Sequence, residues 1–107
     1  MKLELSEDFF LDERVEVSLD ELAELSGLSR VELLGLVETG VLIPVNPHET
    51  HWRFAGNVVV TVRSVRRLRD DFELDTNALP LALVMLERIR ELEAELREVQ
   101  AKLPRLF

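Results

Sequence analysis

The segment SLDELAELSGLSRVELLGLVETGVL, residues 18–42, predicts two short helices separated by a tight turn. Ser18 and Ser29 each begin a capping box, in which a serine and a glutamate three residues later satisfy free amide groups at the start of a helix. Gly27 predicts the end of the first helix, because glycine readily adopts the left-handed conformation found there. Two capped helices joined in this way are typical of the helix-turn-helix motif.

Short β-strands are expected on both sides of this motif. Apolar and polar residues alternate at 15–17 and again at 51–54, and this period of two indicates strands. The sequence Pro-Val-Asn-Pro at 44–47 predicts a turn. We therefore expect residues 41–54 to form a hairpin beside the two helices, which is the wing of a winged helix-turn-helix domain.

The next segment, residues 58–71, is compatible with a strand or a helix. It is rich in β-branched valine, which favours a strand. Its apolar residues, however, recur at spacings of three and four through Phe72, which favours a helix with one buried stripe. We predict the helix, with Arg63, Arg66 and Arg67 on its outer side.

The C-terminal part of the chain predicts one long helix of about 27 residues. It begins after an Asp-Thr-Asn cap at 75–77 and accommodates Pro80 in its first turn. One apolar stripe, formed by Leu79, Leu83 and Leu86, is confined to the first half and is expected to dock on the rest of the protein.

A second apolar stripe runs along the whole of this helix with alternating spacings of three and four, as in a coiled coil. A small domain cannot cover its second half, so we expect a homodimer, since two-fold dimers are the commonest oligomers. The predicted dimer interface consists of Met85, Ile89, Leu92, Leu96, Val99 and Leu103.

The predicted fold is therefore mainly α. Residues 1–75 are expected to form a winged helix-turn-helix-like domain with an acidic N-terminal extension, and residues 76–107 a long coiled-coil dimerisation helix and tail.

The charge of the chain argues against nucleic acid as a partner. The 107 residues carry a formal net charge of −8, whereas a DNA-binding protein needs lysine and arginine to neutralise phosphates. The second helix of the motif offers only Arg30 to read bases. An acidic protein is instead attracted to basic protein surfaces. The candidate partner-binding residues on the two helices are Asp20, Glu21, Glu24, Glu32 and Glu38.

A basic cluster leaves one alternative open, which is a DNA-binding transcription regulator. The candidate phosphate contacts are Arg63, Arg66, Arg67 and Arg69. The competing interpretation is that these arginines pair with the acidic residues that follow them or with the acidic N-terminus.

Enzymatic, metal-binding and membrane functions receive little support. The chain has no cysteine and no tyrosine, and no Gly-rich phosphate loop or Ser/His/Asp set is apparent, so no cofactor is expected. The sequence His-Glu-Thr-His at 48–51 lacks the helical spacing of a zinc site. No apolar run approaches the roughly 20 residues of a membrane span, and the absence of cysteine is compatible with a cytoplasmic protein.

The order of elements over residues 18–103 resembles that of MerR-like proteins, although the Arg-Tyr-Tyr-Glu run usual in MerR-type regulators lacks its Arg and both Tyr at residues 36–40. The chain is more similar to the CbpM-type chaperone modulators. The motifs that carry this resemblance are SGLS (26–29), ETGVLIP (38–44), ETHWRF (49–54) and VRRLRDDFELD (65–75), followed by the Ala/Leu-rich long helix.

The resemblance implies a non-enzymatic protein that binds the J-domain of a DnaJ-like co-chaperone and inhibits its action with DnaK. The charge of the chain agrees with this, because a J-domain presents a basic helix to DnaK and an acidic competitor is steered to the same surface. The assignment of the acidic residues to that contact follows from their charge and not from the resemblance.

Overall fold

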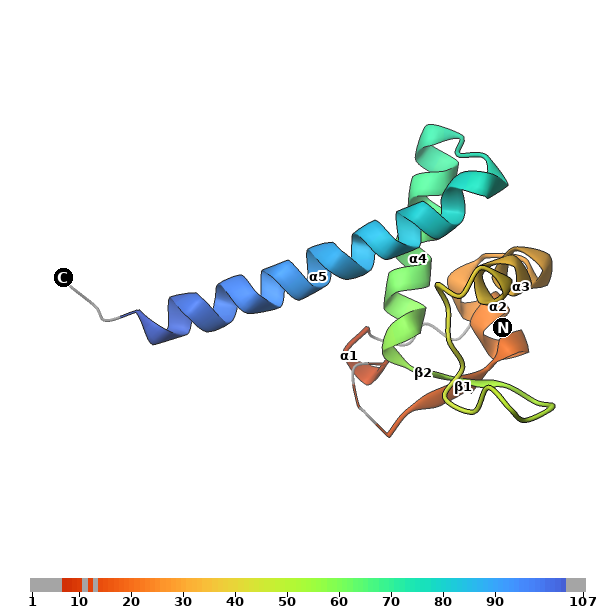
Figure 1. Cartoon of the computed structure of the whole chain (residues 1–107), viewed down its shortest axis with the longest axis horizontal. Coiled ribbons are helices and arrows are strands. Elements are labelled where there is room, and N and C mark those ends of the chain that lie inside the picture. The colour runs from red at the N-terminus through yellow and green to blue at the C-terminus, as the bar shows by residue number, and fades with distance from the viewer. Residues whose placement is uncertain (1–6, 11, 13, 104–107) are drawn as a thin grey trace.

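A computed structural model of the chain describes residues 7–10, 12 and 14–103, and shows a helical body from which one long helix projects (Figure 1). The elements follow in the order α1 (Glu7–Phe10), β1 (Glu16–Ser18), α2 (Leu19–Ser26), α3 (Arg30–Glu38), β2 (Arg53–Ala55), α4 (Asn57–Phe72), the 3₁₀ helix η1 (Thr76–Ala78) and α5 (Leu79–Lys102). The fold is mainly α with a small antiparallel sheet and a long C-terminal helix, as predicted.

Both capping boxes of the helix-turn-helix are formed. The hydroxyl of Ser18 accepts a hydrogen bond from the amide of Glu21 at 3.1 Å, and the Glu21 carboxylate accepts one from the Ser18 amide at 2.9 Å. The same reciprocal pair joins Ser29 and Glu32 at the start of α3. Gly27 follows α2 with a φ of +86°, so the predicted left-handed helix end is confirmed.

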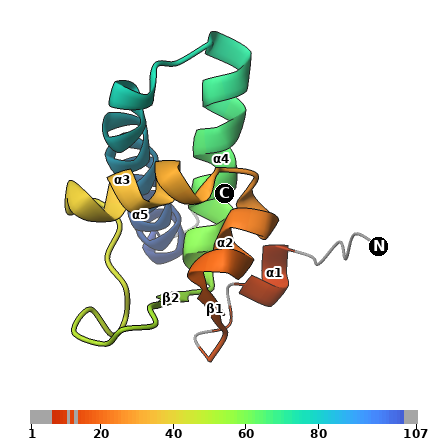
Figure 2. The same cartoon turned by 90° about the vertical axis from the view of Figure 1, so that its right-hand side faces the viewer.

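The predicted hairpin of residues 41–54 is wrong in its strand pairing. β2 pairs with β1, on the N-terminal side of the helix-turn-helix (Figure 2). The pairing is antiparallel, with Val17 opposite Phe54. Pro44 and Pro47 have no amide proton and cannot extend a ladder along the other edge of β2. One hydrogen bond of hairpin type remains there, from the amide of Val45 to the carbonyl oxygen of Arg53 at 2.8 Å.

The loop that replaces the hairpin is organised by one side chain, that of Asn46. Its Nδ2 donates to the carbonyl oxygen of His51 at 2.9 Å and to the Glu49 carboxylate at 2.7 Å. Its Oδ1 accepts from the amide of Arg53 at 2.7 Å. The loop therefore has a defined shape without regular strand pairing, and it delivers Trp52 to the side of α3.

The predicted helix over residues 58–71 is confirmed as α4, which crosses the body and touches most of its other elements (Figures 1 and 2). Phe72 departs from the prediction. It was expected to end the buried stripe, but 70% of its surface is exposed, because no described residue covers the last turn of α4. The core is otherwise built from apolar residues of the five α-helices, the two strands and the segments that follow α2 and α3: Phe10, Val17, Leu19, Leu22, Leu28, Leu33, Leu36, Leu42, Phe54, Val59, Val60, Val62, Val65, Leu79 and Leu83.

The two stripes of α5 separate as the sequence predicts. Leu79 and Leu83 are fully buried and Leu86 packs against the core, so the first half of α5 docks on the body. The second half extends away from it as a single helix (Figure 1). Together η1 and α5 cover residues 76–102, which matches the predicted length.

Candidate partner-binding surface

The acidic side chains of α2 differ in how much of their charge is available. Asp20 is exposed and forms an ion pair with Arg30 of α3. Glu21 is also exposed, but one of its carboxylate oxygens caps the helix at Ser18. Glu24 is exposed near the C-terminal end of α2, beside the arginines of α4. α2 therefore presents a row of carboxylates to solvent, of which Asp20 is already matched by one cation.

On α3 the two candidate acids have different surroundings. Glu38 is exposed at the end of the helix. Glu32 is largely buried, and both of its oxygens accept hydrogen bonds from Arg69 of α4, at 2.5 and 2.7 Å. The structure thus places four of the five predicted acids on the surface and puts Glu32 into a contact between two helices.

The contact between Glu32 and Arg69 controls the ionisation of both side chains. Burial alone raises the pKa of Glu32, but the hydrogen bonds from Arg69 and Ser29 outweigh it and hold the pKa below its usual value. The hydrogen bonds to Glu32 raise the pKa of Arg69 in turn. The pair is fully charged at neutral pH and cannot offer Glu32 to a partner without breaking.

The basic cluster of α4 is engaged within the protein. Arg69 holds Glu32 and also contacts Asp70 at 3.1 Å, and Arg66 forms an ion pair with Asp70 at 2.8 Å. Arg67 is exposed and has an interaction of its own. The positive charge of the cluster is therefore partly neutralised by acidic residues of the protein. This agrees with the interpretation that these arginines pair within the protein and do not bind phosphate.

Arg63 has a structural role that the sequence analysis missed. Its Nε donates to the carbonyl oxygen of Leu25 at 2.9 Å, at the end of α2, where free carbonyl groups need donors. Its guanidinium also lies 5.5 Å from the centre of the Phe10 ring, within range of a cation–π interaction. Arg63 thereby joins α1, α2 and α4. The only hint in the sequence was the pair of aromatic residues at 9–10 in an otherwise acidic segment.

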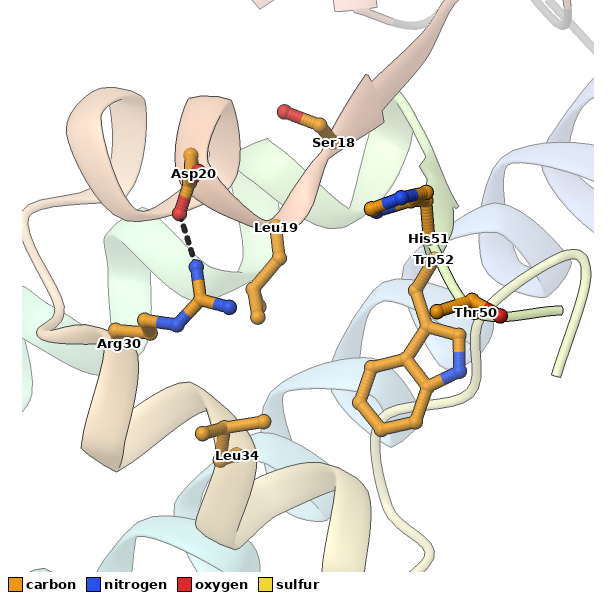
Figure 3. A pocket seen from close by; sticks show the side chains of 8 residues that line it. All are labelled: Ser18, Leu19, Asp20, Arg30, Leu34, Thr50, His51 and Trp52. Carbon is orange, nitrogen blue, oxygen red and sulfur yellow. Dashed lines mark hydrogen bonds and ion pairs between the residues drawn. The ribbon is translucent and has the colours of Figure 1, made fainter.

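A shallow groove of about 290 Å³ lies between α2, α3 and the loop that carries Trp52 (Figure 3). Leu19 and Leu34 face the indole ring of Trp52 across it, and the Asp20–Arg30 ion pair closes one end. Thr50 and His51 line the opposite side. The groove has an apolar interior and a polar rim, which suits the binding of an amphipathic partner.

The outward face of α3 is apolar where a DNA-reading helix is polar. Val31 is 77% exposed, and Leu34, one turn later, lines the groove. Gly35 presents no side chain at all. Neither valine, leucine nor glycine can make the bidentate hydrogen bonds by which bases are read.

The predicted dimer seam is exposed along α5. All six of its residues, Met85, Ile89, Leu92, Leu96, Val99 and Leu103, are about half exposed or more. They form one continuous stripe that begins beside the docked part of α5, at Met85, and runs to the end of the helix.

The described residues, 7–10, 12 and 14–103, provide neither a cluster of metal ligands nor an apolar membrane-spanning helix. No group of three or more His, Cys, Asp or Glu side chains in these ranges could hold a metal ion. His48 and His51 instead lie in the loop organised by Asn46. No helix in the described part of the chain is long and apolar enough to cross a membrane.

Comparison with known proteins agrees with this architecture. Residues 17–101 match the family described as "MerR HTH family regulatory protein". The chain is also 31% identical over 91 residues to "Chaperone modulatory protein CbpM" of Escherichia coli O1:K1 / APEC and to the proteins of the same name from the S88 / ExPEC and E24377A / ETEC strains. Each alignment covers 85% of this chain and 90% of the relative.

These descriptions are of regulators and modulators and not of enzymes. The chain belongs to the MerR-like helix-turn-helix family and, within it, to the CbpM-type chaperone modulators.

Proposed function

We propose that this protein binds the J-domain of a DnaJ-like co-chaperone and inhibits the action of that co-chaperone with DnaK. The observation that carries the proposal is the charge of the helix-turn-helix. α2 and α3 together contain five acidic residues and one arginine, and four of the five carboxylates are at the surface. Such a surface attracts a basic helix and repels a phosphate backbone.

The mechanism we propose is masking without chemistry. A J-domain activates DnaK through a basic helix, and an acidic protein that covers this helix competes with DnaK for it. Complementary charge accelerates the encounter, while apolar contacts close to the charges slow dissociation. Inhibition of this kind is stoichiometric, so it requires a concentration of modulator comparable to that of the co-chaperone.

The proposed functional unit is a cytoplasmic homodimer. The exposed seam of α5 supports dimer formation, because an apolar stripe of this length on a solvated helix is an interaction site. A dimer would present two helix-turn-helix surfaces and could mask two J-domains.

The alternative, a transcription regulator that binds DNA, is weaker on structural grounds. Two of its four candidate phosphate contacts, Arg63 and Arg69, hold the body together, and Arg66 is paired with Asp70. A helix presenting Val31 and Gly35 has little with which to read sequence.

A calorimetric titration tests the proposal directly. The full-length protein is titrated, at about physiological salt, into the J-domains of the co-chaperones of its own organism, with random duplex DNA as the parallel sample. We expect heat of binding with a J-domain and none with DNA. Binding must also reduce the stimulation of DnaK ATPase by the co-chaperone. Binding to DNA alone, with steep loss of affinity as salt increases, would support the alternative.

A further inference from the structure

We propose that the groove between α2, α3 and residues 50–52 receives a bulky apolar side chain from a basic helix of the partner. This inference rests on the proposed function and specifies where the J-domain docks. The relevant geometry is the open space between Leu34 of α3 and the indole ring of Trp52 (Figure 3).

The interior of the groove selects an apolar group. Leu19 and Leu34 form one wall and Trp52 the other, so a side chain placed between them loses contact with water on both sides. The volume of about 290 Å³ is just below the range of roughly 300–1,000 Å³ of small-molecule sites. An open groove of this size suits one or two side chains of a larger partner better than an enclosed ligand.

The rim offers polar groups that are not used within the protein. Among the described residues, the indole N–H of Trp52 and the hydroxyl of Thr50 have no hydrogen-bond partner. Both belong to the groove and can bind polar groups of a docked helix. Indole rings of this amphipathic kind are enriched at the centres of protein interfaces.

The charge around the groove selects a basic helix. Asp20 lies on the groove wall with 81% of its side chain exposed, and Arg30 is the only cation on α2 and α3. Arg69 neutralises Glu32 from behind, but Glu21, Glu24 and Glu38 keep the surface of the two helices negative. Lysine or arginine residues beside the docked apolar side chain are therefore attracted to Asp20 at the groove and to the other carboxylates of α2 and α3.

The groove is formed before binding. Asn46 fixes the backbone on both sides of Trp52, through the carbonyl oxygen of His51 and the amide of Arg53. Phe54, two residues after Trp52, is fully buried in the core. The tryptophan is thus anchored at a fixed distance from α3, and a partner does not have to order the loop.

Trp52 is also the natural probe, because it is the only tryptophan of the chain. The experiment adds the J-domain, with any tryptophan of its own replaced by phenylalanine, to the full-length protein, and records emission and acrylamide quenching. We expect emission at shorter wavelength and weaker quenching as the partly buried indole becomes fully covered. The same samples are titrated by calorimetry, so that binding is measured independently of the probe.

Two matched variants locate the contact. Thr50→Arg adds bulk and positive charge at the groove, and we expect it to weaken J-domain binding about tenfold or more, or about 1.4 kcal/mol. Thr76→Arg makes the same chemical change on exposed η1, at the turn between α4 and α5, and is expected to bind like the unmodified protein. Circular dichroism establishes that both variants retain the helical fold.

The outcomes separate the two proposals. One possible result is that calorimetry shows binding while the emission of Trp52 is unchanged and the two variants bind with equal affinity. That result would overturn the proposal that the groove is the docking site and leave the proposed function standing. Absence of binding to every J-domain of the organism would overturn both.

Discussion

The carboxylate of Glu32 and the guanidinium of Arg69 meet across 37 residues of sequence, with Nη1 of Arg69 2.5 and 2.7 Å from the two carboxylate oxygens. The contact joins α3 to α4, and the same carboxylate caps α3 through the amide of Ser29. A glutamate that was a candidate for partner binding, and an arginine that was a candidate phosphate contact in the alternative function, are thereby used to fix the position of α3.

Replacing Glu32 by Gln tests this role through the dependence of stability on pH. Because the pKa of Glu32 is lowered in the folded protein, the unfolded chain takes up its proton first as pH falls below the usual value near 4.5. The stabilisation by Glu32 is therefore present above that pH and is lost as pH falls towards the lowered pKa. We expect Glu32→Gln to cost about 1–3 kcal/mol at pH 7, because a charged, partly buried hydrogen bond is lost.

Urea unfolding followed by circular dichroism, at pH 7 and at intervals down to pH 3, measures this difference. The unfolding free energies of the two proteins should converge as pH falls below about 4.5. Curves that stay parallel over that range would exclude the ion pair as the source of the difference. Glu38→Gln, on the exposed end of the same helix, is the matched control and should have little effect at any pH.

Reversal of charge on α2 tests the acidic surface itself. Asp20→Lys together with Glu24→Lys is expected to weaken J-domain binding, since attraction to a basic helix becomes repulsion. The ion pair of Asp20 with Arg30 is solvent-exposed and contributes little to stability, so the fold should be retained.

The control for that experiment is a double variant that changes the net charge by the same amount but lies outside α2 and α3. Asp71→Lys with Glu91→Lys alters exposed positions on α4 and α5 and should leave the affinity nearly unchanged. Calorimetry at two salt concentrations measures both variants. Equal losses in the two would mean that only the total charge matters and would remove α2 from the interface.

Adjacent phenylalanines provide a matched test of how the N-terminal segment is attached. Phe10 is 1% exposed and lies beneath Arg63, whereas Phe9 is 48% exposed. We expect Phe10→Ala to lower the unfolding free energy by about 3 kcal/mol, through lost burial and the cavity left behind. Phe9→Ala should cost less than about 1 kcal/mol, because surface substitutions have small effects. Thermal unfolding compares the two, and equal losses would show that α1 is not anchored through Phe10.

The features that the sequence predicted correctly are those encoded locally. Both capping boxes depend on residues three apart, Gly27 on its own backbone freedom, and the stripes of α5 on a repeat of seven. Such patterns need no knowledge of the rest of the fold. For this reason the helices α2 to α5 and the exposed stripe of α5 follow from the sequence, whereas the short helix α1 was not predicted.

The features that the sequence did not predict are contacts between segments that are far apart in the chain. β2 could pair with residues 41–45 or with β1, and local alternation does not distinguish the two. The position of Trp52 depends on the Asn46 side chain, and the anchoring of Phe10 on an arginine 53 residues away. The sequence was enough to place the acidic residues of the candidate surface on their helices. It was not enough to predict that Glu32 pairs with Arg69, or that a groove forms beside Trp52.

Two glycines are expected to respond in opposite directions to the same substitution. A Cβ added at Gly35 on α3 meets nothing within 4 Å, so Gly35→Ala should raise the unfolding free energy by about 0.5–1 kcal/mol through helix propensity. A Cβ at Gly56 would lie 2.9 Å from the carbonyl oxygen of Phe10 and 3.0 Å from Cγ1 of Val15, so Gly56→Ala should be destabilising. Chemical unfolding measures both, and stabilisation by Gly56→Ala would contradict the close packing of the N-terminal segment on the start of α4.

The seam of α5 is tested by introducing charge into it. Leu92→Glu with Leu96→Glu places two carboxylates on the exposed stripe. In sedimentation velocity at one concentration, we expect the unmodified protein to be a dimer and the double variant to be a monomer. The body should remain folded, because both positions lie beyond the part of α5 that docks on it through Leu79 and Leu83. Ala94→Glu with Ala101→Glu adds the same charge to the same part of the helix but outside the seam, and should leave the dimer intact. A dimer that persists in the leucine variant would place self-association elsewhere on the molecule, whereas a monomer in both variants would indicate general charge repulsion and not a specific seam.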